Sequence, residues 1–493
     1  MPGSGELGHT IIPRGADGYF HPATEEDLRL LIVEARASGR KLRVRGSGHS
    51  EPGAYSTEQD GIDVLLDGMS AVEFDDATMQ VTVQAGCHLG VDPEDPSGRS
   101  TRENSLFGQL DARGWAVPTM GGITRQTVGG FLSTGSAGGT VQHSAGGLVL
   151  KIRLMDGTGS VHEFSRSDDR DSAFYAAGVS MGLLGVITAV TLQCVPRFVV
   201  EGEERTSGYE DCEIDLFGDG DAGKPSLEVF LRETEHSHLL WWPQRGARKM
   251  TVWKAKNAGL PHGFSPKPYE QVRRVFGSTW PAYAMLNLSF RLLDGLNPPA
   301  PRGLVARRFE RGLAFLYKLI AGSFLRPSHQ RFQDWWWRGL PSDDGTNYHL
   351  LPTAFTEIWL PLSETKEAMQ RLRRHYDQGG FPATGIYACE LYATPASNFW
   401  MSPAYKQSVL KIDTFWFDRS AIDPHEHFYP QFWELLKDLS YRLHWGKALS
   451  GDVEYLRQRY PRWDDFVRLR QQMDPDHVFL THYWRRHLGF TPL

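Results

Sequence analysis

Residues 43–50, RVRGSGHS, and residues 120–139, MGGITRQTVGGFLSTGSAGG, form two glycine-rich stretches from which the architecture can be predicted. The strand-like residues 41–45, KLRVR, lead straight into the first stretch. Glycine has no Cβ, so successive backbone N–H groups in such loops can close around phosphate oxygens. The two loops therefore predict a site for a cofactor that contains a diphosphate, and His49 lies beside it as a nucleophile or a base.

Two well-known motifs match this sequence only in part. Gly46-Ser47-Gly48 begins like a dinucleotide-binding fingerprint, but the third glycine is missing and the continuation at 51–61, EPGAYSTEQDG, is turn-forming and not helical. Residues 178–182, GVSMG, match the G-x-S-x-G motif of serine hydrolases, which must follow a strand and open a helix. Here a helical pattern precedes the motif and a strand pattern follows it. The sequence therefore favours neither a Rossmann nicotinamide site nor a serine hydrolase.

The composition argues against several classes of protein. A chain of 493 residues is long enough for two or three domains, and its formal charge of -6 gives no overall field that would favour nucleic acid. The four cysteines have no CxxC spacing, so we expect neither a metal site nor a disulfide framework. No apolar run reaches the roughly 18 residues that span a bilayer, and the N-terminus has no signal-peptide pattern. We therefore expect a cytoplasmic protein.

Local patterns divide the chain into an N-terminal part and a part rich in tryptophan. The N-terminal part combines a capped helix after Thr24, short strands and a hairpin through Asp156-Gly157, and it ends near Pro196. From about residue 200 onward, tryptophan clusters alternate with strand patterns, which indicates a second α+β domain. Residues 305–326, VARRFERGLAFLYKLIAGSFLR, are apolar on one side and basic on the other. A surface helix is favoured there over contact with a membrane surface.

Three stretches in the N-terminal part resemble, in order, the PCMH-type FAD-binding domain of the vanillyl-alcohol oxidase superfamily: RVRGSGHS (43–50), GWAVPTMGGITRQTVGGFLSTGSAGG (114–139) and GLLGVITAVTLQCVP (182–196). The C-terminal stretches LHWGKALSG, RYPRWDDFVRLRQQMDP and FLTHYWRRHLG resemble the terminal segment of the sugar-lactone and alditol oxidases. The resemblance implies an α+β fold. It places a PCMH-type FAD-binding domain at 1–200, a substrate domain with an antiparallel sheet at 201–440, and a segment at 441–493 that returns to the FAD domain.

The resemblance also implies how FAD is held, with its isoalloxazine ring at the interface to the second domain. In relatives, the histidine of the RGSGHS-type loop is often attached covalently to the flavin 8α carbon, and this position is His49 here. Cys87 in QAGCHLG is a weaker candidate for a second link, because its place differs from that in bicovalent relatives. The implied FAD-binding residues are Arg45, Gly46, Ser47, Gly48, His49, Ser50, Gly121, Thr127, Gly130, Ser133, Thr134, Gly135, Ser136, Gly138, Gly185, Val186 and Ile187.

The implied reaction is oxidation of a CH–OH group by hydride transfer to flavin N5, with oxygen as acceptor. In relatives, the glutamate of an E-x-R motif and the lysine of an HWGK motif lie near the substrate and N5, and they match Glu390 and Lys447 here. A base or hydrogen-bond acceptor assists loss of the hydroxyl proton, and a cation stabilises negative charge on the reduced flavin. Asp413 and Thr414 in KIDTFW are weaker candidates for the same site.

The sequence departs from the family pattern near the expected substrate. Tyr392 stands where the arginine of E-x-R would be, Ala448-Leu449 follows HWGK where relatives often carry another histidine, and the bulky Phe131-Leu132 stands where small residues are common. We expect Tyr392 in the catalytic site, with the aromatic residues Trp400, Trp416 and Phe417 near it.

These departures leave the substrate open. A sugar lactone, a polyol or another alcohol fits the pattern. The alternatives are a flavoprotein dehydrogenase, an oxidase of a less polar secondary metabolite, and a non-catalytic flavin-binding protein, including one that binds a partner through its basic helix. The oligomeric state is open as well.

Overall fold

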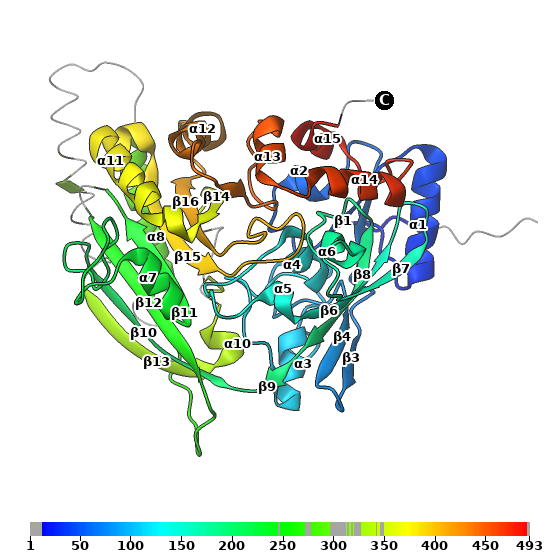
Figure 1. The fold of residues 1–493 in the computed structure, drawn as a ribbon, viewed down its shortest axis with the longest axis horizontal. Helices are drawn as coiled ribbons and strands as arrows, with labels where there is room; N and C mark the ends of the chain where they lie inside the picture. The colour runs from blue at the N-terminus through cyan, green and yellow to red at the C-terminus, as the bar shows by residue number, and fades with distance from the viewer. Residues whose placement is uncertain are drawn as a thin grey trace, which may run out of the picture.

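The structure is a computed structural model that describes residues 12–244, 247–271, 278–295, 327–341, 343–345 and 350–490, with single positions at 312, 315, 316 and 319. Two lobes lie side by side (Figure 1), one built on a five-stranded sheet and the other on an eight-stranded sheet. The chain passes from one lobe to the other between β9 (Val195–Pro196), which pairs with β5, and β10 (Val199–Gly208), a strand of the eight-stranded sheet. The prediction of an α+β fold is confirmed.

The first helix, α1 (Glu25–Ser38), forms where the sequence predicts it. The Thr24 hydroxyl accepts a hydrogen bond from the Asp27 N–H at 3.1 Å, and the Asp27 carboxylate accepts one from the Thr24 N–H at 3.0 Å. This capping box supplies partners for backbone groups that the helix cannot pair internally. The helix ends at Gly39, whose φ of 71° is the left-handed conformation of a helix cap. Its buried side chains are Leu28, Leu31, Ile32 and Ala35.

The N-terminal lobe is an antiparallel sheet surrounded by short helices. Its strand order is β3 (Val72–Asp75), β4 (Gln80–Gln84), β8 (Val186–Gln193), β6 (Val149–Met155) and β7 (Val161–Ser165). The parallel pair β1 (Leu42–Arg45) and β2 (Ile62–Leu65) lies apart from it, and β5 (Trp115–Ala116) pairs with β9. The other helices of this lobe are α2 (Pro52–Tyr55), α3 (Leu106–Arg113), α4 (Val128–Thr134), α5 (Ala145–Leu148) and α6 (Ala173–Ala177).

The residues after the first glycine loop are partly helical. Pro52–Tyr55 forms α2, so the expectation of a purely turn-forming continuation is wrong there. Proline suits the start of a helical turn because it has no N–H to leave unpaired and because its fixed φ is already helical. The turn ends at Ser56, which is extended. The helix is therefore far shorter than the one that follows a Rossmann fingerprint.

The second lobe is built on one large antiparallel sheet. Its order is β13 (Ser328–Trp335), β10, β12 (Lys249–Ala258), β11 (His236–Trp242), β15 (Ile386–Thr394), β16 (Val409–Phe417), β14 (Thr353–Pro361) and β17 (Arg442–Leu443). The accompanying helices are α7 (Leu227–Glu233), α8 (Trp280–Gly295), α10 (Trp336–Gly339), the 3₁₀ turn η1 (Leu362–Glu364), α11 (Thr365–Thr384) and α12 (Pro424–Leu436). The central strands β15 and β16 are almost entirely buried, because both of their faces are covered.

Alternation along β16 determines which side chains share a face of this sheet. Trp416 packs on Phe428 and Phe432 of α12, with ring centroids 6.4 and 6.0 Å away, so even-numbered positions of β16 face α12. Odd-numbered positions such as Asp413 therefore face the opposite way. The expectation that Trp416 lies near the substrate is wrong. It is also wrong for Trp400, whose indole donates to the Arg170 carbonyl at 3.0 Å in the N-terminal lobe.

The C-terminal segment returns to the N-terminal lobe, as the resemblance implies. It forms α13 (Val453–Arg459), α14 (Trp463–Met473) and α15 (His482–Leu488), which lie near α1 and α2 in Figure 1. The Leu42 N–H of β1 donates to the Val478 carbonyl at 2.9 Å. The Trp484 indole donates to the Ala54 carbonyl of α2 at 3.0 Å. These bonds fix the strand that leads into the first glycine loop.

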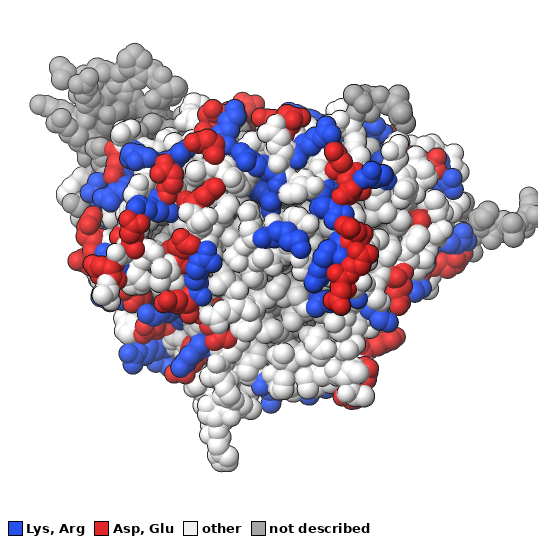
Figure 2. Space-filling model, viewed as in Figure 1, with Lys and Arg blue, Asp and Glu red and all other residues white. Residues whose placement is uncertain are grey.

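Basic and acidic side chains are interspersed on the face drawn in Figure 2. Ion pairs join some side chains of opposite charge, and the Arg462 guanidinium lies 2.5 Å from Asp171 and 2.6 Å from Asp465. In the part of the chain that the structure covers, no helix is both long enough and apolar enough to cross a membrane. Most of the basic and apolar stretch at 305–326 lies outside the described residues, so the expectation of a surface helix there stays a prediction.

Candidate active site

A long cleft in the N-terminal lobe collects most of the residues that the sequence assigns to FAD. It is lined by Arg45, Gly46, Ser47, Gly48, His49, Ser50, Thr127, Gly130, Ser133, Thr134, Gly185, Val186 and Ile187, together with other residues of β1, β2 and the C-terminal segment. Gly121 and Gly138 instead line a small cleft between the lobes, beside Tyr392. Gly135 and Ser136 line an apolar cavity next to Phe399.

The glycines of this cleft lie where a side chain would not fit. A Cβ on Gly46 would lie 2.6 Å from the Thr127 hydroxyl oxygen, which caps α4 by accepting from the Gly130 N–H at 3.2 Å. Gly48 has a φ of +80° and Gly185 a φ of +152°, which other residues rarely adopt. We call this arrangement the glycine cradle. Its side-chain-free backbone fits the diphosphate of FAD.

His49 projects from the glycine cradle without a protein partner for its outer nitrogen. Its Nε2 atom is buried, and among the described residues it has no hydrogen-bond partner. Burial, assisted by the positive charge of Lys447, lowers the pKa of His49 to about 4. The imidazole is therefore neutral and nucleophilic at neutral pH. An unpaired buried nitrogen at this place fits a flavin that either accepts its hydrogen bond or forms a bond with it.

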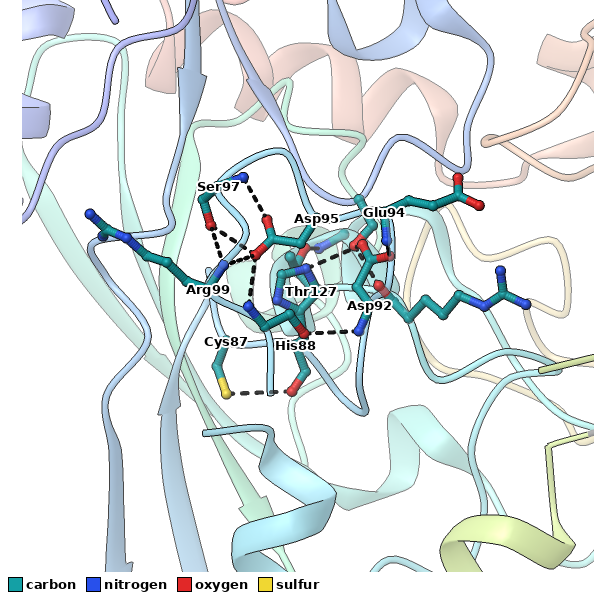
Figure 3. Close-up of polar contacts among 12 residues, drawn as sticks. Cys87, His88, Asp92, Glu94, Asp95, Ser97, Arg99 and Thr127 are labelled. Carbon is teal, nitrogen blue, oxygen red and sulfur yellow. Dashed lines mark hydrogen bonds and ion pairs between the residues drawn. The ribbon is translucent and has the colours of Figure 1, made fainter. Parts of the chain in front are cut away.

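The polar loop at 91–104 folds against the same cleft, which Asp95 and His88 also line. Figure 3 shows this loop: the Asp95 carboxylate accepts from the Ser97 N–H at 3.0 Å and from the Arg99 N–H at 2.9 Å. His88 lies 3.5 Å from the Asp92 carboxylate. The loop therefore holds its own shape through side-chain bonds to its backbone, and it closes one side of the cleft.

The candidate second link through Cys87 does not fit the structure. The Cys87 thiol points to the Asn104 carbonyl, 3.6 Å away, and does not line the cleft. Burial raises the pKa of this thiol to about 12, so the nucleophilic thiolate is scarce at neutral pH.

Three carboxyl groups form a row across the centre of the large sheet, on the face away from α12. Asp413 of β16 lies opposite Glu390 of β15 on one side and opposite Glu357 of β14 on the other. Each of the three residues is 4% exposed. Burial, together with the negative charges of Glu357 and Glu390, raises the pKa of Asp413 well above its usual range. The raised pKa favours the protonated form of Asp413. At Glu357, nearby positive groups outweigh burial and lower the pKa.

A second row of side chains lies two residues from the acid row on the same strands. It contains a lysine and aromatic residues. Tyr392 of β15 lies opposite Lys411 of β16, and the Lys411 Nζ atom lies 3.7 Å from the centroid of the Tyr392 ring. Lys411 is 2% exposed, lies 3.7 Å from the Glu357 carboxylate, and donates to the Ala137 carbonyl of the N-terminal lobe at 2.6 Å. Lys411 thus places a cation beside the position where the E-x-R arginine is missing.

His238 of β11 completes this arrangement by pairing with Glu390. Its Nε2 atom contacts the Glu390 carboxylate, and its ring centroid lies 5.9 Å from that of Tyr392. Burial favours the neutral imidazole, but the Glu390 carboxylate outweighs it and raises the pKa of His238 to about 9. His238 and Glu390 therefore form a charged pair at neutral pH.

Lys447 connects the acid row to the glycine cradle. The Glu51 N–H donates to the Gly446 carbonyl at 2.9 Å, so the HWGK loop packs directly on the loop that carries His49. The Lys447 Nζ atom lies 3.7 Å from the centroid of the Phe355 ring. Burial lowers the pKa of Lys447, and the carboxyl groups of Asp413, Glu357 and Glu390 oppose that shift. The structure therefore brings together the three residues that the sequence assigns to catalysis, Glu390, Tyr392 and Lys447.

Sequence reasoning missed three members of this site: His238, Glu357 and Lys411. Each residue lies in an ordinary strand pattern. Only the register between neighbouring strands brings these acids and cations together. Lys411 precedes the weaker candidate Asp413 by two residues, so the period of a strand places both on one face. This spacing is the feature of the sequence from which Lys411 could have been identified as a site residue.

Comparisons with known proteins agree with this geometry. The family model described as D-arabinono-1,4-lactone oxidase matches residues 190–487, and a model described as FAD binding domain matches residues 16–91. The chain belongs to the D-arabinono-1,4-lactone oxidase family. The family match and the FAD-domain match together confirm the prediction of an FAD-dependent oxidoreductase.

Two relatives that align with nearly the whole chain are named as an oxidase and a dehydrogenase of L-gulonolactone. An L-gulono-1,4-lactone dehydrogenase of Mycobacterium tuberculosis is 26% identical over 472 residues, covering 95% of each chain. An L-gulonolactone oxidase of Scyliorhinus torazame is 24% identical over 469 residues, covering 94% of this chain and 93% of the relative. Among solved structures, a variant of cholesterol oxidase from Brevibacterium sterolicum has a TM-score of 0.68 at 14% identity, covering 95% of this chain and 94% of that one. This last likeness supports the fold alone.

Proposed function

We propose that the protein oxidises a CH–OH group of a sugar lactone or a closely related polyol, with oxygen as the electron acceptor. The observation that carries this proposal is the group of buried acids and cations, Glu357, Glu390, Lys411 and Asp413, beside the small interlobe cleft. Buried charged groups need polar partners. A polyhydroxy substrate offers hydroxyl groups to them, whereas an apolar alcohol would leave some of them unpaired.

Each residue of the site has a chemical task in this reaction. The glycine cradle would hold FAD, which would supply the hydride acceptor that no side chain here can provide. Glu390, held by His238, accepts the hydrogen bond of the substrate hydroxyl that loses its proton. Lys447 and Lys411 supply positive charge that balances the negative charge developing during oxidation.

The substrate class can be tested directly on the FAD-loaded protein. We expect L-gulono-1,4-lactone and related lactones to bleach the flavin without air, and to do so with a kcat/KM about 10²-fold above that of an apolar secondary alcohol, because the alcohol cannot pair the buried polar groups. Hydrogen peroxide measured under air then separates an oxidase from a dehydrogenase that needs another acceptor. A preference for the apolar alcohol would contradict the proposed substrate, and a flavin that no substrate bleaches would indicate a non-catalytic protein.

The proposal includes a covalent bond between His49 and the flavin. Its support is the unpaired, buried Nε2 atom of His49 and the neutral state that its low pKa gives the imidazole. A nucleophilic nitrogen held in the glycine cradle would suit this bond, in which the imidazole nitrogen would replace one hydrogen of the flavin 8α carbon and oxygen would take up the two electrons and two protons released.

Acid precipitation tests this bond. We expect the yellow colour to stay in the precipitate of the wild-type protein and to pass into the supernatant of His49→Ala, because the bond survives acid whereas reversible contacts do not. The intact mass of the wild-type chain should rise by one FAD. His88→Ala is the matched control, since His88 lines the same cleft but pairs with Asp92. Colour that leaves the wild-type precipitate completely would show that His49 only hydrogen-bonds the cofactor.

A further inference from the structure

Two histidines and a glutamate converge at the rim between the lobes, outside the site described above. The Glu235 Oε1 atom lies 2.9 Å from His143 Nε2 and 3.9 Å from His236 Nε2, and the three atoms all lie within 4.8 Å of one another. His236 is the first residue of β11 and Glu235 directly precedes it, whereas His143 belongs to the N-terminal lobe, just before α5. The cluster therefore spans the two lobes.

The donor atoms are arranged as ligands of a transition-metal ion. Zn²⁺ bound tetrahedrally at about 2.0–2.2 Å holds its ligand atoms roughly 3.3 Å apart, and the observed separations lie on either side of that value. His236 is buried, and its Nε2 atom faces the Glu235 carboxylate. The Asn257 N–H donates to Glu235 Oε2 at 3.2 Å, which leaves Oε1 facing the imidazoles.

A fourth donor atom, which is an oxygen, lies beside the cluster. A path by which an ion can enter is also present. The Asn257 side-chain oxygen Oδ1 lies 3.0 Å from His236 Nε2. The side chains of His143 and Glu235 are 27% and 24% exposed, so an ion can reach the cluster from solvent. The titratable groups in contact with His236 are Glu235 and His143, whose ring centroid lies 5.4 Å from that of His236. A dication would therefore meet one carboxylate and two imidazole rings.

A second convergent cluster, His238, Asp343 and Glu390, does not share these properties. There a proton on His238 balances Glu390, and Lys447 and Lys411 act on the same acids. A dication would be repelled by these cations. Of the two clusters, the one at the rim is therefore the better site for a metal ion.

We infer that His143, Glu235 and His236 bind a divalent transition-metal ion, with Zn²⁺ as the preferred ion, and that this ion clasps the two lobes together. The neighbouring residue Ser237 already bonds across the same boundary, its N–H donating to the Gly139 carbonyl at 2.7 Å. His236 and His238 line the same small cleft. The ion would therefore hold the strand that carries His238 against the loop that contains Gly139 and His143.

Zinc binding to the FAD-loaded protein tests the inference. After treatment with a chelator and dialysis against Zn²⁺, we expect one tightly held zinc per chain by elemental analysis and a higher melting temperature, because the ion binds the folded state. His143→Ala and Glu235→Gln should each weaken zinc binding by about 10²-fold or more and abolish the thermal shift.

His329→Ala is the matched control. His329 also faces a glutamate on the large sheet, with Nε2 2.9 Å from Glu203, but Arg331 and Lys254 flank that glutamate. The control should keep both the zinc and the thermal shift. The inference is overturned if the wild-type protein retains no zinc, or if His143→Ala retains as much as the wild type. Because His143 and Glu235 are partly exposed, their variants should fold even if His236→Ala does not.

Discussion

Glu390→Gln is expected to slow substrate-driven reduction of the flavin by about 10² or more, the usual scale for a positioned acid–base group, while FAD stays bound. Glutamine keeps the size of the side chain and removes its charge. The substrate hydroxyl then loses its charged acceptor, and His238 loses the partner that holds its proton. Anaerobic stopped-flow reduction, followed by flavin absorbance, measures the rate.

The pH profile separates this role from a merely structural one. The raised pKa of His238, about 9, means that the charged pair with Glu390 exists below that pH and is lost as pH rises through it. We therefore expect kcat/KM of the wild-type protein to fall above about pH 9. In Glu390→Gln this alkaline fall of kcat/KM should move to lower pH, because burial without the carboxylate favours the neutral imidazole.

Glu203→Gln is the control for this variant. Glu203 also pairs with a histidine on the large sheet, His329, but on outer strands away from the cleft. It should leave both the rate and the pH profile unchanged. Reduction by Glu390→Gln within about threefold of the wild type, with an unmoved alkaline limb, would show that Glu390 is not catalytic.

The parts of the fold and site that the sequence predicts correctly depend on local chemistry. The capping box at Thr24 and Asp27, the left-handed Gly39 and the hairpin through Asp156-Gly157 each involve residues a few positions apart. The glycine cradle is similar, because a missing Cβ can be read from one residue at a time. Family resemblance then assigned Glu390 and Lys447, which local patterns alone could not have distinguished from surface charges.

The rest of the site depends on contacts between distant parts of the chain. His238 pairs with a residue 152 positions away, and His143 with one 92 positions away. Lys411 lies beside the position of the missing arginine only because β15 and β16 pair in a register that places it opposite Tyr392. A shift of one residue would turn Lys411 to the other face of the sheet, so no local pattern could have placed it.

Lys447→Met is the second change with a large expected effect. Methionine keeps much of the volume of lysine and removes its charge, which leaves Glu357 and Glu390 with less positive charge near them. We expect flavin reduction to slow by about 10² or more, because a fixed cation that offsets developing negative charge is worth this scale of rate. The pKa of His49 should rise as well, because the positive charge of Lys447 is, after burial, the main cause of its low value.

The control and the readouts for Lys447→Met distinguish catalysis from stability. Lys437→Met removes an exposed lysine that pairs with Glu434 at 3.3 Å, and it should leave reduction unchanged. Melting temperature and FAD content, measured on both variants, show whether the fold and the cofactor survive. If Lys447→Met keeps its FAD and reduces it within about threefold of the wild-type rate, the lysine only balances buried charge, and the cation needed in the reaction has to come from elsewhere in the site. If reduction slows with the fold and FAD intact, the cation that links the acid row to the glycine cradle acts in the reaction itself, because its removal changes the rate without changing what is bound.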